Sequence, residues 1–186
     1  MKRQTLALVA VTLAGLSSIA TSTAVPGWSL DATPLVGAPL ILVAGTAGTA
    51  SRHVTATISA EAMDDDYTEG WLQLSAEGCF TAVAGTSGTV QPARLRVVLL
   101  RDADQAEGQV LEQPLPLCPS RISFFVDAPL NGPCPANAPC VLGYDLSFER
   151  LGEAAEVHVD WTVSATLIDY GQKNPPEGAA ITLTED

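Results

Sequence analysis

Basic side chains are scarce in this 186-residue sequence. Nine Lys and Arg stand against 21 Asp and Glu, so the formal net charge is -12 at pH 7. Binding to nucleic acids or anionic lipids depends on clustered Lys and Arg, which an acidic balance opposes. We therefore expect no nucleic-acid partner. The excess of carboxylates favours solubility and, weakly, an affinity for cations.

The sequence also has no apolar run of the roughly 20 residues that a membrane-spanning helix needs. An apolar stretch at residues 6–16 follows two basic residues and precedes the small residues Ser22, Thr23 and Ala24, as in a secretory signal peptide. We expect residues 1–24 to be removed. Residues 25–186 then form one domain without a membrane span, secreted, periplasmic or at the cell surface.

The four cysteines contain no C-x2-C pair, so an exported chain with this even number is expected to form two disulfides rather than a zinc site or a catalytic thiol. The predicted strand at residues 122–127 separates Cys118 from Cys134 and Cys140. Its ends lie roughly 20 Å apart, whereas a disulfide needs Cα atoms within about 7 Å. We predict the pairs Cys79–Cys118 and Cys134–Cys140.

Helical periodicity is lacking as well, and apolar residues instead recur with a period of two. The clearest runs are residues 140–148 and 156–168, which a short polar bend joins as a predicted hairpin. No long helix is expected. A single helical turn is expected near residues 60–66 or 103–107. Further strands are predicted at residues 35–43, 53–60, 71–83 (with a break at Glu77-Gly78 left open), 93–101, 109–115, 122–127 and 179–184.

Eight or nine short strands separated by Gly-, Pro- and Asp-rich bends predict an all-β fold, an antiparallel β-sandwich of immunoglobulin-like or jelly-roll type. Two Gly-Thr-rich octamers, VAGTAGTA at residues 43–50 and VAGTSGTV at 83–90, are each followed by a strand-like stretch. A phosphate-binding loop leads into a helix instead. We therefore expect both octamers to be connections at strand ends.

Catalytic motifs are missing from the sequence. There is no G-x-S-x-G elbow, and only His53 and His158 are available. His158 and Asp160 form H-x-D, but no second histidine follows to complete an iron-binding triad, so a solvated strand face is expected there. We expect a non-catalytic binding, adhesive or cell-envelope structural module. The alternative is a small secreted hydrolase with carboxylate chemistry, for which glycans are one substrate class.

Aromatic residues make up only 5% of the chain. Trp161 is in phase with apolar neighbours and is expected in the core. Trp71 is out of phase with Leu72 and Leu74 and lies close to Tyr67 in sequence. Trp71 and Tyr67 are the candidate ligand-binding residues, as a stacking platform for a sugar ring, with a capping role for Trp71 as the alternative.

Two acidic segments, residues 64–69 and 102–107, are expected at the same end of the sandwich, with the Gly-Thr connections at the other, because alternate loops of antiparallel strands share an end. Asp64, Asp66, Asp102 and Asp104 would then supply several of the 6–8 oxygen ligands that calcium prefers. Acidic surface loops are usually just solvated. Calcium is the one cofactor for which these residues raise a hypothesis.

Overall fold

The structure, a computed structural model, describes residues 27–43, 48–63, 68–82, 93–102, 104–130, 134, 138–153, 156–170 and 174–186. Within these residues the chain is built almost entirely of strands, with the short 3-10 turn η2 (Ala60–Met63) after β4. The strands are β1 (Trp28–Asp31), β2 (Leu35–Val36), β3 (Leu40–Val43), β4 (Thr49–Ile58), β5 (Thr68–Thr81), β6 (Arg94–Arg101), β7 (Asp104–Pro114), β8 (Ile122–Pro129), β9 (Cys140–Leu151), β10 (Glu156–Asp169) and β11 (Ile181–Glu185).

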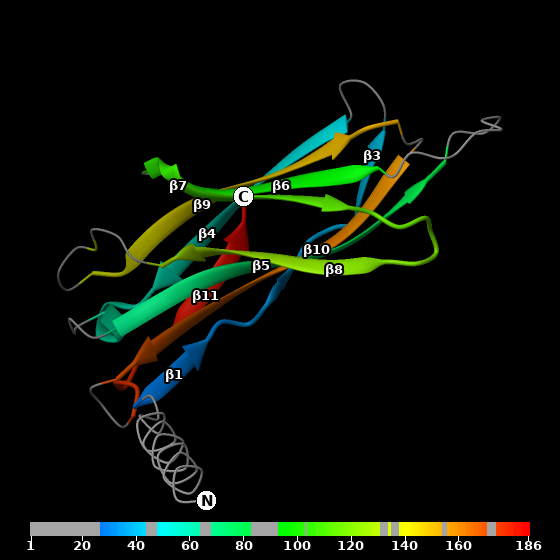
Figure 1. The fold of residues 1–186 in the computed structure, drawn as a ribbon. Coiled ribbons are helices and arrows are strands. Elements are labelled where there is room, and N and C mark those ends of the chain that lie inside the picture. Colours follow the sequence, from blue (N-terminus) through cyan, green and yellow to red (C-terminus); the bar gives the residue numbers. More distant parts are fainter. Residues whose placement is uncertain are drawn as a thin grey trace, which may run out of the picture.

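The strands form two antiparallel sheets that pack face to face (Figure 1). In the first, which we call sheet A, β10 pairs with β5 on one side and with β1, β2 and β3 along the other, and β8 pairs with β5. In the second, sheet B, the order is β11-β4-β9-β6-β7. The predicted all-β antiparallel sandwich is thus confirmed.

Strand pairing is nested. β6 pairs with β9, β5 with β10 and β4 with β11, so each outer pair encloses the next along the chain, and successive pairs alternate between the sheets. Between β7 and β8, the innermost two strands, the Gln109 side-chain oxygen accepts a hydrogen bond of 3.2 Å from the Asp127 backbone N–H. The three nested pairs are typical of a jelly roll, whereas β7 pairs with β6 in sheet B and not with β8.

The core lies between the sheets and follows the period of two. Every second residue of β10 from Val157 to Leu167 is buried, as are alternate residues of β9 from Cys140 to Phe148. The rings of Phe148 and Trp161 meet across the two sheets with their centroids 6.0 Å apart. Trp161 is 2% exposed, which confirms its predicted core position.

The predicted hairpin between residues 140–148 and 156–168 is wrong. β9 pairs only with strands of sheet B and β10 only with strands of sheet A, so the connection between them crosses from one sheet to the other. The two strands face each other across the core instead of lying side by side. Alternation identifies a strand's buried face, but two facing strands and two neighbouring strands produce the same alternation.

Several predicted strand boundaries change. β5 runs unbroken through Glu77 and Gly78, and a strand, not a helical turn, begins at Asp104, whereas the turn expected near Ala60 is present as η2. The stretch at residues 35–43 is divided into β2 and β3 where the Trp161 indole N–H donates to the Ala38 carbonyl at 3.0 Å. β1 was not predicted.

Both predicted disulfides are present. Their Cα atoms are 5.2 Å apart in Cys79–Cys118 and 4.9 Å apart in Cys134–Cys140. The first ties β5 to the segment that carries the chain from β7 in sheet B to β8 in sheet A. Backbone bonds from Cys118 N to Phe80 O and from Phe80 N to Pro116 O, each 3.0 Å long, reinforce the same junction.

Some predictions fall outside the described residues. These include the signal segment at residues 1–24 and the second Gly-Thr octamer, whereas the first octamer extends from the end of β3 to the start of β4. In the described part of the chain, no helix has the length and apolar character needed to cross a membrane.

Candidate functional site

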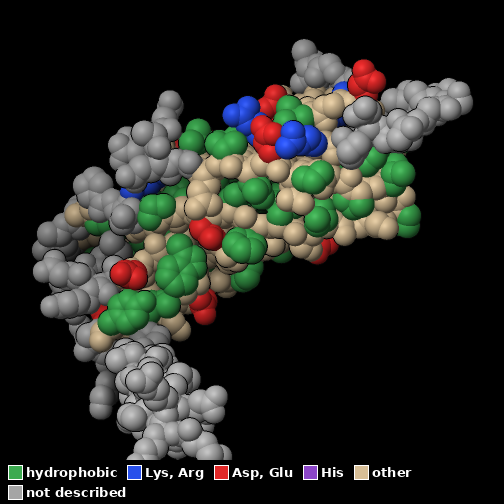
Figure 2. Space-filling view, in the orientation of Figure 1, with side chains coloured by type: hydrophobic (Ala, Val, Ile, Leu, Met, Phe, Trp, Pro, Cys, Tyr) green, Lys and Arg blue, Asp and Glu red, His purple; other side chains and the backbone are tan. Residues whose placement is uncertain are grey.

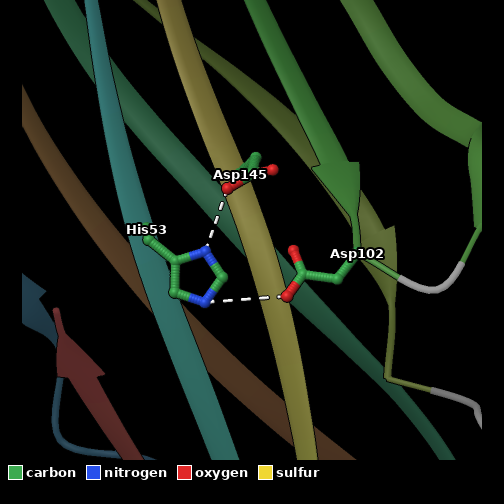
Figure 3. A group of neighbouring side chains, drawn as sticks. All are labelled: His53, Asp102 and Asp145. Atoms are coloured by element: carbon green, nitrogen blue, oxygen red, sulfur yellow. Dashed lines mark hydrogen bonds and ion pairs between the residues drawn. The ribbon is translucent and has the colours of Figure 1, made fainter.

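One cluster of titratable side chains stands out on the outer face of sheet B. It consists of His53 on β4, Asp145 on β9 and Asp102 in the turn after β6 (Figure 3). The two ring nitrogens of His53 face different carboxylates. His53 Nδ1 lies 2.9 Å from Asp145 Oδ1, and His53 Nε2 lies 3.7 Å from Asp102 Oδ2.

Strand register brings these residues together. His53 and Asp145 are direct partners in the β4–β9 ladder, and both point outward because Val54 and Tyr144, their neighbours in sequence, are buried. On the other side of β9, β6 ends at Arg101, and the next residue, Asp102, donates its backbone N–H to the Gly143 carbonyl at 3.0 Å. Three segments far apart in sequence thus meet on three adjacent strands.

Gly143 leaves the space that the Asp102 carboxylate occupies. A Cβ at this position would overlap the Asp102 carboxylate and would come within 3.1 Å of His53 Cε1. A side chain at position 143 would therefore separate Asp102 from His53. The absence of a side chain here is a requirement of the cluster.

The carboxylates favour the charged imidazolium. The hydrogen bond with Asp145 is the largest effect raising the pKa of His53 above its ordinary value of 6.5, and partial burial opposes it. The charges of Asp102, Asp145 and Asp186 raise the pKa of His53 further.

An open groove of about 460 Å³ runs beside the cluster. It is bordered by Ala38, Ser51, Arg52, His53, Asp145, Glu185 and Asp186. Arg52 pairs with Glu185 at 3.1 Å, and Asp186 accepts a hydrogen bond of 2.8 Å from Thr55. The cationic group of Arg52 is thereby held by a carboxylate, and the groove beside His53 keeps an acidic character.

The cluster does not have the arrangement of a serine hydrolase. Such an enzyme needs a hydroxyl nucleophile within hydrogen-bond reach of the histidine nitrogen that does not contact the acid. Here the second nitrogen of His53 faces a second carboxylate, that of Asp102. The group is suited to holding a proton or a cation between an imidazole and carboxylates.

The structure describes only one of the four predicted calcium ligands in full. Asp64 and Asp66 lie outside the described residues, and for Asp104 the backbone in β7 is described but not the side chain. Asp102 is described, and its carboxylate lies beside His53. Calcium binding by the four aspartates therefore stays a prediction.

Strand direction agrees with the predicted placement of the two acidic segments. β4 and β6 both run antiparallel to β9, so residues 64–69 and 102–107 follow strands that point the same way. β4 ends opposite Cys140, whereas β6 ends opposite Tyr144, four residues short of it. The ends of β4 and β6, after which the two acidic segments begin, are therefore about 13 Å apart along the sheet.

The predicted ligand-binding pair is only half described. Trp71 lies partly buried on the outer face of sheet A, opposite Thr166 of β10 and Pro129 of β8. Tyr67 lies outside the described residues. The second histidine, His158, is on the same face and pairs with Glu156 at 3.2 Å, in line with the expected polar strand face.

The contribution of Asp145 was missed at the sequence level. It lies 92 residues from His53 in the chain, and its own surroundings, a strand with alternating polarity, show no metal or catalytic motif. Only the pairing of β4 with β9 makes the two neighbours. Asp145 could have been identified only from the pairing of the two strands, and the period of apolar residues does not reveal which strands pair.

No protein-family model matches this chain, and no curated protein matches its sequence. Among solved structures, an electron cryo-microscopy structure of the Cowpea Mosaic Virus empty virus-like particle matches with a TM-score of 0.29 and 10% identity, over 70% of this chain and 80% of that chain. A cryo-EM structure of Broad Bean Stain Virus matches with a TM-score of 0.32 and 9% identity, over 87% and 91%. At these values the similarity carries no argument about function.

Proposed function

We propose that this chain is an exported, disulfide-linked β-sandwich that works by binding a partner or ligand, in an adhesive or cell-envelope role, and not by catalysis. The export signal in the sequence supports the location, and the two disulfides are compatible with an oxidising, extracellular environment. The observation that carries the binding role is the character of the outer face of sheet A.

This face exposes apolar side chains between short polar ones. Phe125 on β8, 63% exposed, lies opposite Ser75, which is followed across the sheet by Thr162 and then by Val36, 74% exposed. Over β5 and β8, Figure 2 shows hydrophobic side chains spaced among polar surface instead of gathered in one place. Single apolar residues are ordinary on a protein surface, whereas aromatic side chains are enriched at the centres of interfaces, so the aromatic residues of this face are the candidate contacts.

Trp71 extends this surface. It lies on the same face as Ser75, four residues earlier on β5, so aromatic groups occur at two points along neighbouring strands. Between them, Gln73 donates a hydrogen bond of 2.9 Å to Asp127. We propose Trp71 and Phe125 as the contact residues, with Tyr67 retained as a candidate from sequence.

A paired substitution tests the proposal. The purified protein is screened on a glycan array and against extracellular proteins, and any binding is then measured for Phe125→Ser and Val141→Ser. Val141 is 64% exposed on β9 of sheet B, so it is a matched control on the other sheet. Loss of an apolar contact at the centre of an interface weakens binding by about tenfold or more.

We expect Phe125→Ser and Trp71→Ala to weaken binding, and Val141→Ser to leave it unchanged. Equal binding by all variants would mean that sheet A is not the contact face. If neither screen detects a ligand, the binding role itself is contradicted.

The alternative, a hydrolase with carboxylate chemistry, has one arrangement in its favour. Glu77 and Asp160 are partners across β5 and β10 and border the same shallow pocket of about 390 Å³. Both carboxylates are engaged, however, because Asp160 pairs with Arg121 and Glu77 accepts a hydrogen bond of 2.9 Å from Ser123. Glycan hydrolysis that Glu77→Gln abolishes would favour the enzyme over the binding module.

A further inference from the structure

We propose that His53 and Asp102 together bind a divalent transition-metal ion, for which zinc is the best match, and that Asp145 positions the imidazole for it. One ligand atom from each of the three residues lies within 4.8 Å of the others. The proposed site is on sheet B and the proposed contact face is on sheet A, so this inference does not depend on the binding role.

The gap between the two proposed ligand atoms suits a metal better than a hydrogen bond. His53 Nε2 and Asp102 Oδ2 are 3.7 Å apart, which exceeds the roughly 3.2 Å limit of a good N–H···O bond. Two zinc bonds of about 2.1 Å at a tetrahedral angle hold their ligand atoms about 3.4 Å apart. An ion between these atoms therefore requires only a small closing movement of Asp102, which belongs to a turn.

Asp145 directs the His53 ring toward that gap. When His53 Nδ1 carries the proton, it donates to Asp145 Oδ1 at 2.9 Å, and Nε2 keeps the lone pair that a metal needs. Metal-binding histidines commonly donate their other N–H to a carboxylate, which fixes the tautomer and the ring orientation. Figure 3 shows the imidazole held in this way, with Asp145 at Nδ1 and Asp102 on the far side at Nε2.

Gly143 supplies the room for the second ligand. The Asp102 carboxylate lies where a Cβ of residue 143 would be, and its backbone N–H is tied to the Gly143 carbonyl at 3.0 Å. The turn and the missing side chain together hold an oxygen ligand over β9, next to an imidazole that belongs to β4. The turn at Asp102 and the glycine at position 143 lie about 40 residues apart in the sequence, so they contribute to the site independently.

The ligand types favour zinc over calcium. Calcium takes 6–8 oxygen ligands, whereas zinc accepts imidazole nitrogen together with carboxylate oxygen and completes its coordination with water. The side chains of His53 and Asp102 are 34% and 47% exposed, so water reaches the gap between them. Asp145 Oδ1 lies 2.9 Å from His53 Nδ1, and Asp186 borders the same groove as His53, so negative charge on both sides favours a cation at this place.

The test is a calorimetric titration of the purified, untagged protein with zinc chloride after removal of bound metal with a chelator. His53→Ala is compared with His158→Ala, since these are the two histidines of the chain. We expect one zinc ion per chain, binding lost in His53→Ala and kept in His158→Ala. Asp145→Asn should weaken binding by about 10- to 100-fold, the usual effect of removing a carboxylate that orients a metal-binding histidine.

Gly143→Ala is a sharper variant, because it removes no ligand atom and acts only by displacing Asp102. Circular dichroism and melting temperature in the chelator establish that each variant is folded, and long-range ¹H–¹⁵N spectra of the His53 ring report the metal at Nε2 independently of the heat. The proposal is overturned if the unchanged protein shows no heat at millimolar zinc, or if His53→Ala or Asp102→Asn binds zinc as tightly as the unchanged protein.

Discussion

At the residue scale, Tyr144 links burial to stability at high pH. Its side chain is buried in β9 and donates a hydrogen bond of 2.8 Å to the Pro129 carbonyl. Burial raises the pKa of Tyr144 from 10.0 to about 12, while the positive charge of Arg101 opposes the change. The unfolded chain therefore loses this proton near pH 10, before the folded chain does, and the stabilisation declines as the pH rises from 10 toward 12.

We predict that Tyr144→Phe is less stable than the unchanged protein by about 0.5–1.5 kcal/mol at neutral pH, because one hydrogen bond is lost. The difference should shrink by about 1 kcal/mol near pH 11, where only the unchanged protein is penalised for keeping the hydroxyl neutral. Urea unfolding at a series of pH values measures both. Tyr170→Phe, at an exposed tyrosine, is the control and should show neither effect.

Single residues also show how far the sequence predicts the site. The core position of Trp161 follows from its phase in one strand, so it was predictable. Asp102 was a candidate calcium ligand together with Asp64, Asp66 and Asp104, and the structure places its carboxylate close to His53 and Asp145. Those two contacts depend on the pairing of β4 with β9 and on the space at Gly143. Neither can be recognised from the residues near Asp102 in the sequence.

At the scale of elements, the strands themselves were largely predictable and their partners were not. The period of two locates β9 and β10 because each buries one face against the same core. The period does not indicate which sheet a strand joins. The expected hairpin between β9 and β10 is wrong for this reason. The disulfides were predictable because the length of β8 excludes two of the three pairings.

The two disulfides should contribute unequally to stability. Cys79–Cys118 closes a separation of 39 residues and ties the crossover between sheets to β5, whereas Cys134–Cys140 closes a separation of 6. Loop-closure entropy predicts a loss of about 4 kcal/mol for removing the first and about 2 kcal/mol for removing the second. Chemical unfolding of the two double Cys→Ala variants measures these losses. A larger loss from the shorter loop would contradict the entropic explanation.

At the scale of the whole molecule, charge is the dominant feature. With 21 acidic and nine basic residues, the folded chain concentrates negative charge that the unfolded chain spreads out. Arg52, Arg94, Arg96 and Arg121 each pair with an acidic side chain, yet exposed pairs contribute little. Mutual repulsion among the remaining carboxylates is therefore expected to lower the melting temperature in dilute buffer.

We predict that the melting temperature rises when sodium chloride is increased from about 0.01 M to 0.15 M, because the screening length falls from about 30 Å to about 8 Å. Differential scanning calorimetry in a chelator-containing buffer measures the change without interference from bound metal. Replacing sodium chloride with sodium acetate separates screening from specific chloride binding. A melting temperature that falls with salt would mean that the ion pairs outweigh the repulsion.

The nested pairing of the strands also governs the order in which the chain can fold. β10, the central strand of sheet A, pairs with both β5 and the first three strands, and β11 completes sheet B at β4. Neither sheet can close until the polypeptide beyond residue 156 has been synthesised, and most contacts that define the fold join distant parts of the chain. Proteins with such topology fold slowly. During synthesis the emerging chain therefore remains without its native core, in a form that can still be threaded through a narrow channel.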